Sequence, residues 1–82
     1  MNKRKEVRLL PHLWSEDLAA QDRHYAFEVR QFPRTGERYL TITETSILNG
    51  RRQRVAVTVR SYDLLNFVTS LVRSAFHLSN LV

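Results

Sequence analysis

Residues 38–45 read Arg-Tyr-Leu-Thr-Ile-Thr-Glu-Thr and alternate without a break between two kinds of side chain. Because successive side chains of a strand point to opposite sides of a sheet, Leu40 and Ile42 share one face, while Tyr39, Thr41 and Thr43 share the other. Antiparallel sheets commonly cover their apolar face and leave the polar face to solvent or to a ligand. The segment therefore predicts a half-buried strand with an open polar face.

Two flanking segments, residues 24–32 and 51–60, alternate in the same way. Their inward-facing positions hold Tyr25, Phe27, Val29, Val55, Val57 and Val59. Residues 33–37, Pro-Arg-Thr-Gly-Glu, and the dipeptide Asn49-Gly50 have the composition of hairpin turns. We therefore expect three antiparallel strands that are neighbours in chain order.

After Ser61 the apolar period changes from two to about 3.6, which predicts a helix that ends near residues 77–79. Ser61 is the expected N-cap, and Asp63 suits the positive end of the helix dipole. The apolar side chains cover more than one stripe, and this excess indicates a partner subunit. The expected dimer contacts are Leu64, Phe67, Val68, Leu71 and Phe76.

Residues 12–20 alternate imperfectly, so the residues alone allow a helix as well as a strand.

The length and composition describe one small domain, with 82 residues of which 43% are hydrophobic and 26% charged. A chain of this size leaves much apolar surface exposed when it folds alone, which again favours a dimer. The chain has no cysteine, so neither a disulfide nor a thiolate metal site is expected. No stretch approaches the roughly 18 apolar residues of a membrane span, so we expect a cytoplasmic protein without a membrane partner.

The charge balance favours polyanionic partners. Thirteen Lys and Arg against eight Asp and Glu give a net charge of +5, and such a charge attracts nucleic acid over long distances. Residues 1–11 are interpreted as a basic flexible arm, and residues 12–82 as the single domain.

If the three strands pair as expected, their outward side chains make one surface. That surface offers cations for phosphates, hydroxyls for phosphate oxygens or base edges, and an aromatic ring for stacking. Its candidate nucleic-acid-binding residues are Arg30, Tyr39, Thr41, Thr43, Arg54, Thr58 and Arg60. An ordinary solvated sheet face has a similar composition, so composition alone leaves both interpretations open.

Catalysis has little support in the sequence. The three histidines, His12, His24 and His77, are far apart, and there is no glycine-rich phosphate loop. We expect no catalytic residue, no metal, no cofactor and no small-molecule substrate, and hence no enzyme.

Two segments resemble the repeat of the purine-rich-element-binding (PUR) proteins and their small bacterial relatives. They are residues 13–29, Leu-Trp-Ser-Glu-Asp-Leu-Ala-Ala-Gln-Asp-Arg-His-Tyr-Ala-Phe-Glu-Val, and, after a Gly-containing turn, residues 39–44, Tyr-Leu-Thr-Ile-Thr-Glu. The resemblance covers about residues 13–77. It implies an α+β fold with a four-stranded antiparallel curved sheet followed by one helix (ββββα), in which residues 13–20 form the first strand. It also implies an intertwined homodimer made through the C-terminal helix, in a bacterial cytoplasm or nucleoid.

The same resemblance implies binding of single-stranded DNA or RNA on the curved sheet, with a preference for purine-rich and especially G-rich strands. The base-contacting linker of the family, Gln-Asn-Lys-Arg, falls on residues 21–24, so Gln21 and Arg23 become candidate contacts. Asp22 departs from the pattern, because an acid repels phosphate. The stacking aromatic residue of the family matches Tyr25, although alternation places Tyr25 on the core side unless it lies at the rim of the sheet.

Two other functions are compatible with the sequence. One is a dimeric protein-interaction module that binds no nucleic acid, and the other is a β-ribbon protein that binds duplex DNA.

Overall fold

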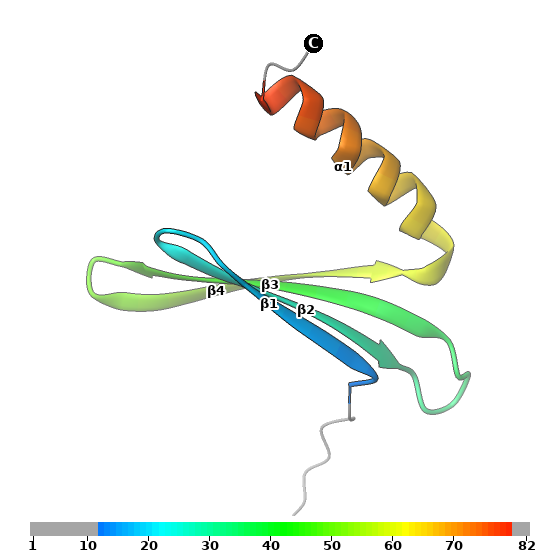
Figure 1. Cartoon of the computed structure of the whole chain (residues 1–82). Helices are drawn as coiled ribbons and strands as arrows, with labels where there is room; N and C mark the ends of the chain where they lie inside the picture. Colours follow the sequence, from blue (N-terminus) through cyan, green and yellow to red (C-terminus); the bar gives the residue numbers. More distant parts are fainter. Residues whose placement is uncertain (1–11, 80–82) are drawn as a thin grey trace, which may run out of the picture.

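The computed structural model describes residues 12–79, which form one open antiparallel sheet followed by one helix (Figure 1). The strand order in the sheet is β1-β2-β3-β4. The elements are β1 (Trp14–Ala19), β2 (Arg23–Gln31), β3 (Arg38–Leu48), β4 (Arg51–Arg60), the 3₁₀ turn η1 (Ser61–Asp63) and α1 (Leu64–Ser79). The expected ββββα fold is thus confirmed. The expected basic arm, residues 1–11, lies outside the described residues.

The first element, β1, is a strand, which resolves the ambiguity of residues 12–20. Trp14 lies opposite Val29, and the Leu13 amide donates a hydrogen bond to the Val29 carbonyl at 2.7 Å. β2 supplies the hydrogen-bond partners for the backbone of this segment. The side-chain pattern of β1 alone does not reveal this pairing.

The cross-strand register gives the sheet two chemically distinct faces. Leu40 lies between Val29 and Val59, and on the other side of the sheet Thr41 lies opposite Thr58. Directly opposite residues of an antiparallel pair share a face. The apolar face carries Trp14, Leu18, Tyr25, Phe27, Val29, Leu40, Ile42, Val55, Val57 and Val59. The polar face carries Ser15, His24, Ala26, Glu28, Arg30, Tyr39, Thr41, Thr43, Thr45, Arg54, Ala56, Thr58 and Arg60.

The β3–β4 turn has the geometry that its Asn-Gly sequence predicts. Asn49 has φ 54° and Gly50 has φ 76°, and positive φ at both central residues defines a type I′ turn. This turn matches the twist of the strands it joins.

The beginning of the helix differs from the expectation. The chain leaves β4 through η1, and the Ser61 hydroxyl donates a hydrogen bond to the Glu37 carboxylate at 3.2 Å. Ser61 is therefore not the predicted N-cap, because it is already the first residue of η1: Arg60 takes the N-cap position, and no side chain caps the turn. Asp63 lies in the first turn, as expected.

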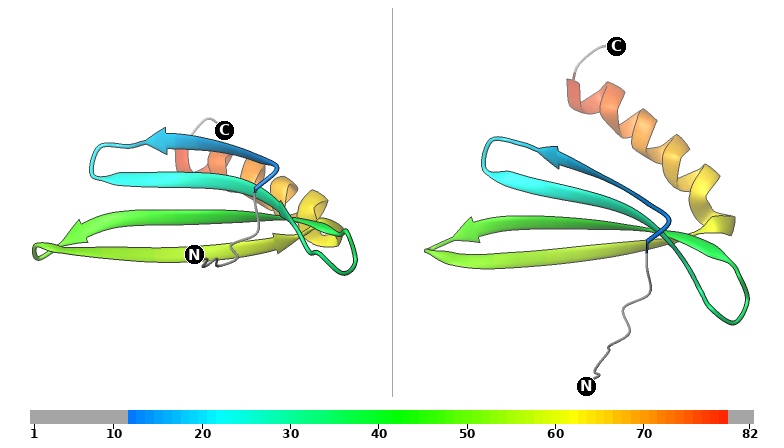
Figure 2. Two further views of the ribbon diagram at one scale, coloured as in Figure 1. Left: turned by 90° about the horizontal axis from the view of Figure 1, so that it is seen from below. Right: turned by 60° about the horizontal axis from the view of Figure 1, so that its bottom comes forward.

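The core of the single chain is small. Val59, 5% exposed, is the one buried residue among residues 12–79. Leu64 lies close to Leu40 and Val59, so α1 begins on the side of the apolar face. From there α1 runs obliquely away from the strands (Figures 1 and 2), and Val57 stays 47% exposed. Most of the apolar face is thus left without a covering layer.

Within residues 12–79, no helix has the length and apolar character needed to cross a membrane.

The β3–β4 turn generates a test of the fold. A Cβ at position 50 would meet no atom within 4 Å, so Gly50→Ala acts through the positive φ alone. We expect Gly50→Ala to lower the free energy of unfolding by about 1 kcal/mol. Asn49→Gly is the matched control and should cost less, since glycine adopts this φ without strain. Urea denaturation measures both, and a Gly50→Ala protein as stable as the wild type would contradict the turn assignment.

Candidate nucleic-acid interface

The polar face is shallow in its middle and bulky at its ends. Thr43 lies between Ala26 and Ala56, and this row of small side chains crosses three strands. The neighbouring row pairs Thr41 with Thr58. The register therefore brings together the hydroxyl groups that the sequence assigned to a polar surface, and they form the floor of a shallow path.

One end of this path is a basic groove between the β1–β2 turn and the β3–β4 hairpin, which we call the turn groove. It is lined by Ala20, Gln21, Asp22, Arg23, His24, Thr45, Ser46, Ile47, Arg52 and Arg54. Three of the candidate residues, Gln21, Arg23 and Arg54, meet here although they are up to 33 positions apart. Asp22 lines the same groove, so the acid that departs from the PUR pattern lies among the candidate contacts.

The predicted cations differ in how far acids compensate their charge. Arg30 forms an ion pair with Glu28 at 2.9 Å, and a second pair joins Arg23 to Glu44 at 3.3 Å. By contrast, no ion pair within residues 12–79 involves Arg51, Arg52 or Arg54. Arg52 and Arg54 therefore bring uncompensated positive charge into the turn groove, whereas the register places Arg51 on the apolar face, opposite Leu48.

Tyr25 lies on the apolar face and not with Tyr39. The register places it opposite Glu44, and its hydroxyl donates a hydrogen bond to the Glu44 carboxylate at 3.0 Å. This hydrogen bond is the main reason that the pKa of Tyr25 is raised above its usual value of 10.0. Alternation predicted this face correctly, and Tyr25 is separated from the candidate residues of the polar face, although it shares the Glu44 carboxylate with Arg23. Arg23 occupies a position of β2 on the same face as Tyr25, but its side chain nevertheless lines the turn groove.

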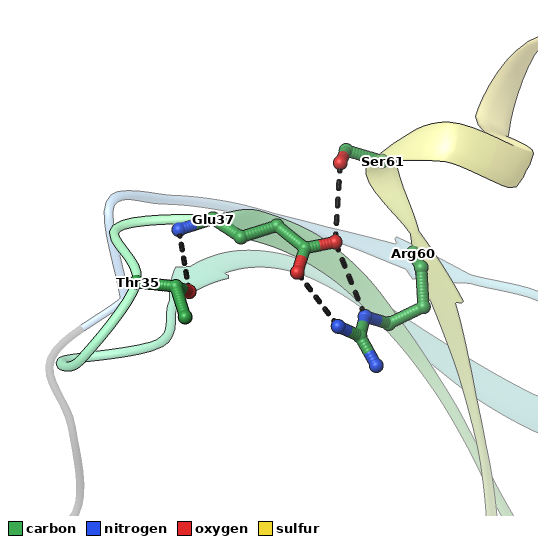
Figure 3. Close-up of polar contacts among 4 residues, drawn as sticks. All are labelled: Thr35, Glu37, Arg60 and Ser61. Carbon is green, nitrogen blue, oxygen red and sulfur yellow. Dashed lines mark hydrogen bonds and ion pairs between the residues drawn. The ribbon is translucent and has the colours of Figure 1, made fainter.

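The other end of the path lies beside the β2–β3 loop, where Arg60 is clamped by Glu37 (Figure 3). The Arg60 guanidinium donates two hydrogen bonds to the Glu37 carboxylate, at 2.6 and 3.2 Å. The Ser61 hydroxyl donates to the same carboxylate, and the Thr35 hydroxyl accepts a hydrogen bond from the Glu37 amide at 3.1 Å. The guanidinium holds the pKa of Glu37 below its usual value of 4.5, and the carboxylate raises the pKa of Arg60. The Glu37 carboxylate thus fixes the position of the Arg60 guanidinium and balances its positive charge.

The aromatic side chains gather at this same end. The rings of Phe32 and Tyr39 stack with centroids 4.3 Å apart and planes 26° apart. The Arg60 guanidinium lies 4.8 Å from the Phe32 ring centroid and 5.4 Å from that of Tyr62. Phe32 therefore already covers part of the surface of the Tyr39 ring.

Sequence reasoning missed Phe32, Glu37 and Tyr62 as members of this surface. Glu37 lies in the loop between two strands, where period-two alternation carries no information. Phe32 ends the alternating segment 24–32 and has the parity of its outward positions, so alternation could have found it. Tyr62 had a usable signal, because it continues the outward positions of β4 by two residues beyond Arg60.

The five helix residues assigned to a dimer contact, Leu64, Phe67, Val68, Leu71 and Phe76, lack full cover in the single chain. Leu71, for example, is 56% exposed. The other side of the helix carries polar residues such as Ser70 and Arg73.

No protein-family model matches this chain, and neither does any curated protein or solved structure. The resemblance of residues 13–77 to a PUR repeat therefore stays a prediction.

The Glu37–Arg60 clamp predicts an acid-dependent loss of stability. Because the pKa of Glu37 is lowered in the folded chain, the clamp stabilises it above pH 4.5 and is lost as the pH falls through the lowered pKa. Glu37→Gln should therefore lower the melting temperature more at pH 7 than at pH 3. Glu16→Gln, which removes an exposed acid from β1, is the control. Equal effects of Glu37→Gln at both pH values would show that the charge is not responsible.

Proposed function

We propose that this protein binds single-stranded nucleic acid, DNA or RNA, along the polar face of its sheet, and that it does so as a homodimer. The proposal rests on the order in which three kinds of side chain follow one another along this face. Uncompensated arginines lie at the turn groove, threonine hydroxyls follow, and aromatic rings lie at the far end. Cationic grooves with aromatic platforms are the usual means of holding single strands.

The dimensions of the path support an extended ligand. Arg54 and Arg60 are six positions apart on one strand, which corresponds to about 20 Å at the usual rise per residue. This length accommodates several nucleotides. The floor of Thr41, Thr43 and Thr58 offers hydroxyl donors to phosphate oxygens.

The cations are expected to contribute unequally. Arg54, together with Arg52 in the same groove, can contact phosphate without giving up an ion pair within residues 12–79. Arg30 and Arg60 would have to share their guanidinium groups with Glu28 and Glu37, which reduces their value as phosphate contacts. We assign the main phosphate contacts to the hairpin end.

An unpaired strand is favoured over a duplex because exposed rings bind bases only when the bases are unstacked. The preference for purine-rich and G-rich strands rests on the PUR resemblance, and so does the location in a bacterial cytoplasm or nucleoid.

The homodimer is supported by the apolar surface that the single chain leaves uncovered. On the apolar face Val55 and Val57 are 58% and 47% exposed, and the exposed apolar side of α1 begins at Leu64, beside Val29 and Val59. One chain with so little buried area is marginal by itself. A second copy that exchanges helices would cover both surfaces at once, through Leu64, Phe67, Val68, Leu71 and Phe76.

The binding function is tested by fluorescence anisotropy with a G-rich 24-mer, a pyrimidine 24-mer and a duplex over a series of salt concentrations. We expect the single strands to bind, the G-rich strand most tightly. Arg54→Ala should weaken binding and reduce the slope of log affinity against log salt by about 0.7, the value for one phosphate contact. Arg38→Ala, which removes the same side chain from the opposite face, should leave the slope unchanged.

Absence of binding to either single strand at low salt would refute the proposal. A salt-insensitive interaction with a protein partner would then favour the interaction module, and preference for the duplex would favour the ribbon type.

The dimer is tested by multi-angle light scattering on Leu71→Asp. A charge at the apolar side of α1 should convert the dimer to monomer, since burying an unpaired carboxylate is very unfavourable. Ser70→Asp adds the same charge on the polar side of the helix and should remain dimeric. A wild-type protein that is monomeric at tens of micromolar would overturn this part of the proposal.

A further inference from the structure

Four side chains at the loop end of the polar face form a continuous column: Tyr39, Phe32, Arg60 and Tyr62. Phe32 stacks on Tyr39, and the Arg60 guanidinium lies near both the Phe32 and the Tyr62 rings. We call this set the stacked column. It begins on β3 and ends in η1, just before α1.

The column is held in place by hydrogen bonds outside the rings. Glu37 binds the Arg60 guanidinium through both of its oxygens, and Ser61 donates to Glu37 from the residue adjacent to Tyr62 (Figure 3). The loop that carries Glu37 is closed by two backbone hydrogen bonds of 2.9 Å between Phe32 and residues 36 and 37. Arg60 is therefore fixed with its guanidinium within cation–π distance of two aromatic rings, a contact for which a guanidinium is well suited.

The outer member of the column, Tyr62, is open to solvent. Its side chain is 71% exposed, whereas Phe32 and Tyr39 are only partly exposed. Stacking on Phe32 already occupies part of Tyr39, the aromatic residue that sequence alternation indicated. Tyr62 thus offers the larger accessible ring at this end of the path.

We propose that Tyr62 is a base-stacking residue and that the stacked column forms a subsite for one unpaired nucleobase at the loop end of the polar face. The inference rests on the proposed function and deepens it by separating two roles along the face. The hairpin end holds phosphates through Arg54 and its neighbours, and the loop end holds a base. Because Glu37 compensates Arg60, the subsite binds the base mainly through ring contact and contributes little to the salt dependence.

The experiment compares wild type, Tyr62→Ala, Tyr62→Leu and Tyr62→Phe in their affinity for the purine-rich 24-mer, with light scattering on each protein. A second probe is the same strand carrying the fluorescent base 2-aminopurine, whose emission falls when it stacks on an aromatic ring. Leu65→Ala is the control, because Leu65 is 78% exposed and lies three positions away on α1.

We expect Tyr62→Ala and Tyr62→Leu to bind about tenfold more weakly than wild type, with the salt slope and the oligomeric state unchanged. Tyr62→Phe should bind like wild type, since the ring and not the hydroxyl makes the contact. Quenching of 2-aminopurine at one position of the strand should be lost in the Ala and Leu variants.

Three results would overturn the subsite while leaving the proposed function intact. They are unchanged affinity of Tyr62→Ala, a loss of affinity that follows dissociation of the dimer, and a Tyr62→Phe protein as weak as Tyr62→Ala. If the wild type itself binds no single strand, the proposed function fails and the subsite fails with it.

Discussion

The antiparallel register of β3 with β2 and β4 is the constraint on which the rest of this structure depends. Because side chains alternate along a strand, a slip of one residue would turn Thr41 and Thr43 inward and expose Leu40 and Ile42. The Asn49-Gly50 turn holds the register on one side, since a two-residue type I′ turn permits a single alignment of its strands. The polar path and the apolar face are therefore two consequences of one alignment.

The same alignment leaves the chain short of a core. A sheet with one apolar face needs a covering layer, but α1 starts at the corner beyond Val59 and departs from the sheet (Figure 1). α1 follows η1, and η1 is tied to the β2–β3 loop through Ser61 and Glu37. The clamp at the loop end of the polar face is thus connected to the start of the helix, where the proposed ligand surface and the proposed dimer surface come together.

Local periodicity predicted most of the fold and part of the candidate site. Strands β2, β3 and β4, both hairpin turns and the face of every alternating residue follow from side-chain pattern, including the placement of Tyr25 away from Tyr39. The first strand was ambiguous because it is a short edge strand whose backbone is satisfied only by pairing with β2. The expected cap at Ser61 was wrong because the first turn already begins at Ser61, which leaves Arg60 in the N-cap position. The Ser61 hydroxyl donates to Glu37, 24 positions earlier, and such a contact depends on loop conformation, which side-chain periodicity does not encode.

Charge compensation is the property of the site that sequence could not supply, and it changes the mechanism. By composition alone, Arg30, Arg54 and Arg60 are equivalent phosphate contacts. In the structure two of them lie beside acids, and these two occupy the end where the aromatic rings gather. A guanidinium in an ion pair keeps its planar face for ring contact but has less to gain from phosphate, whereas an uncompensated one binds phosphate strongly. Under the proposed function, the distribution of acids along the face therefore favours phosphate binding at the hairpin and base stacking at the loop.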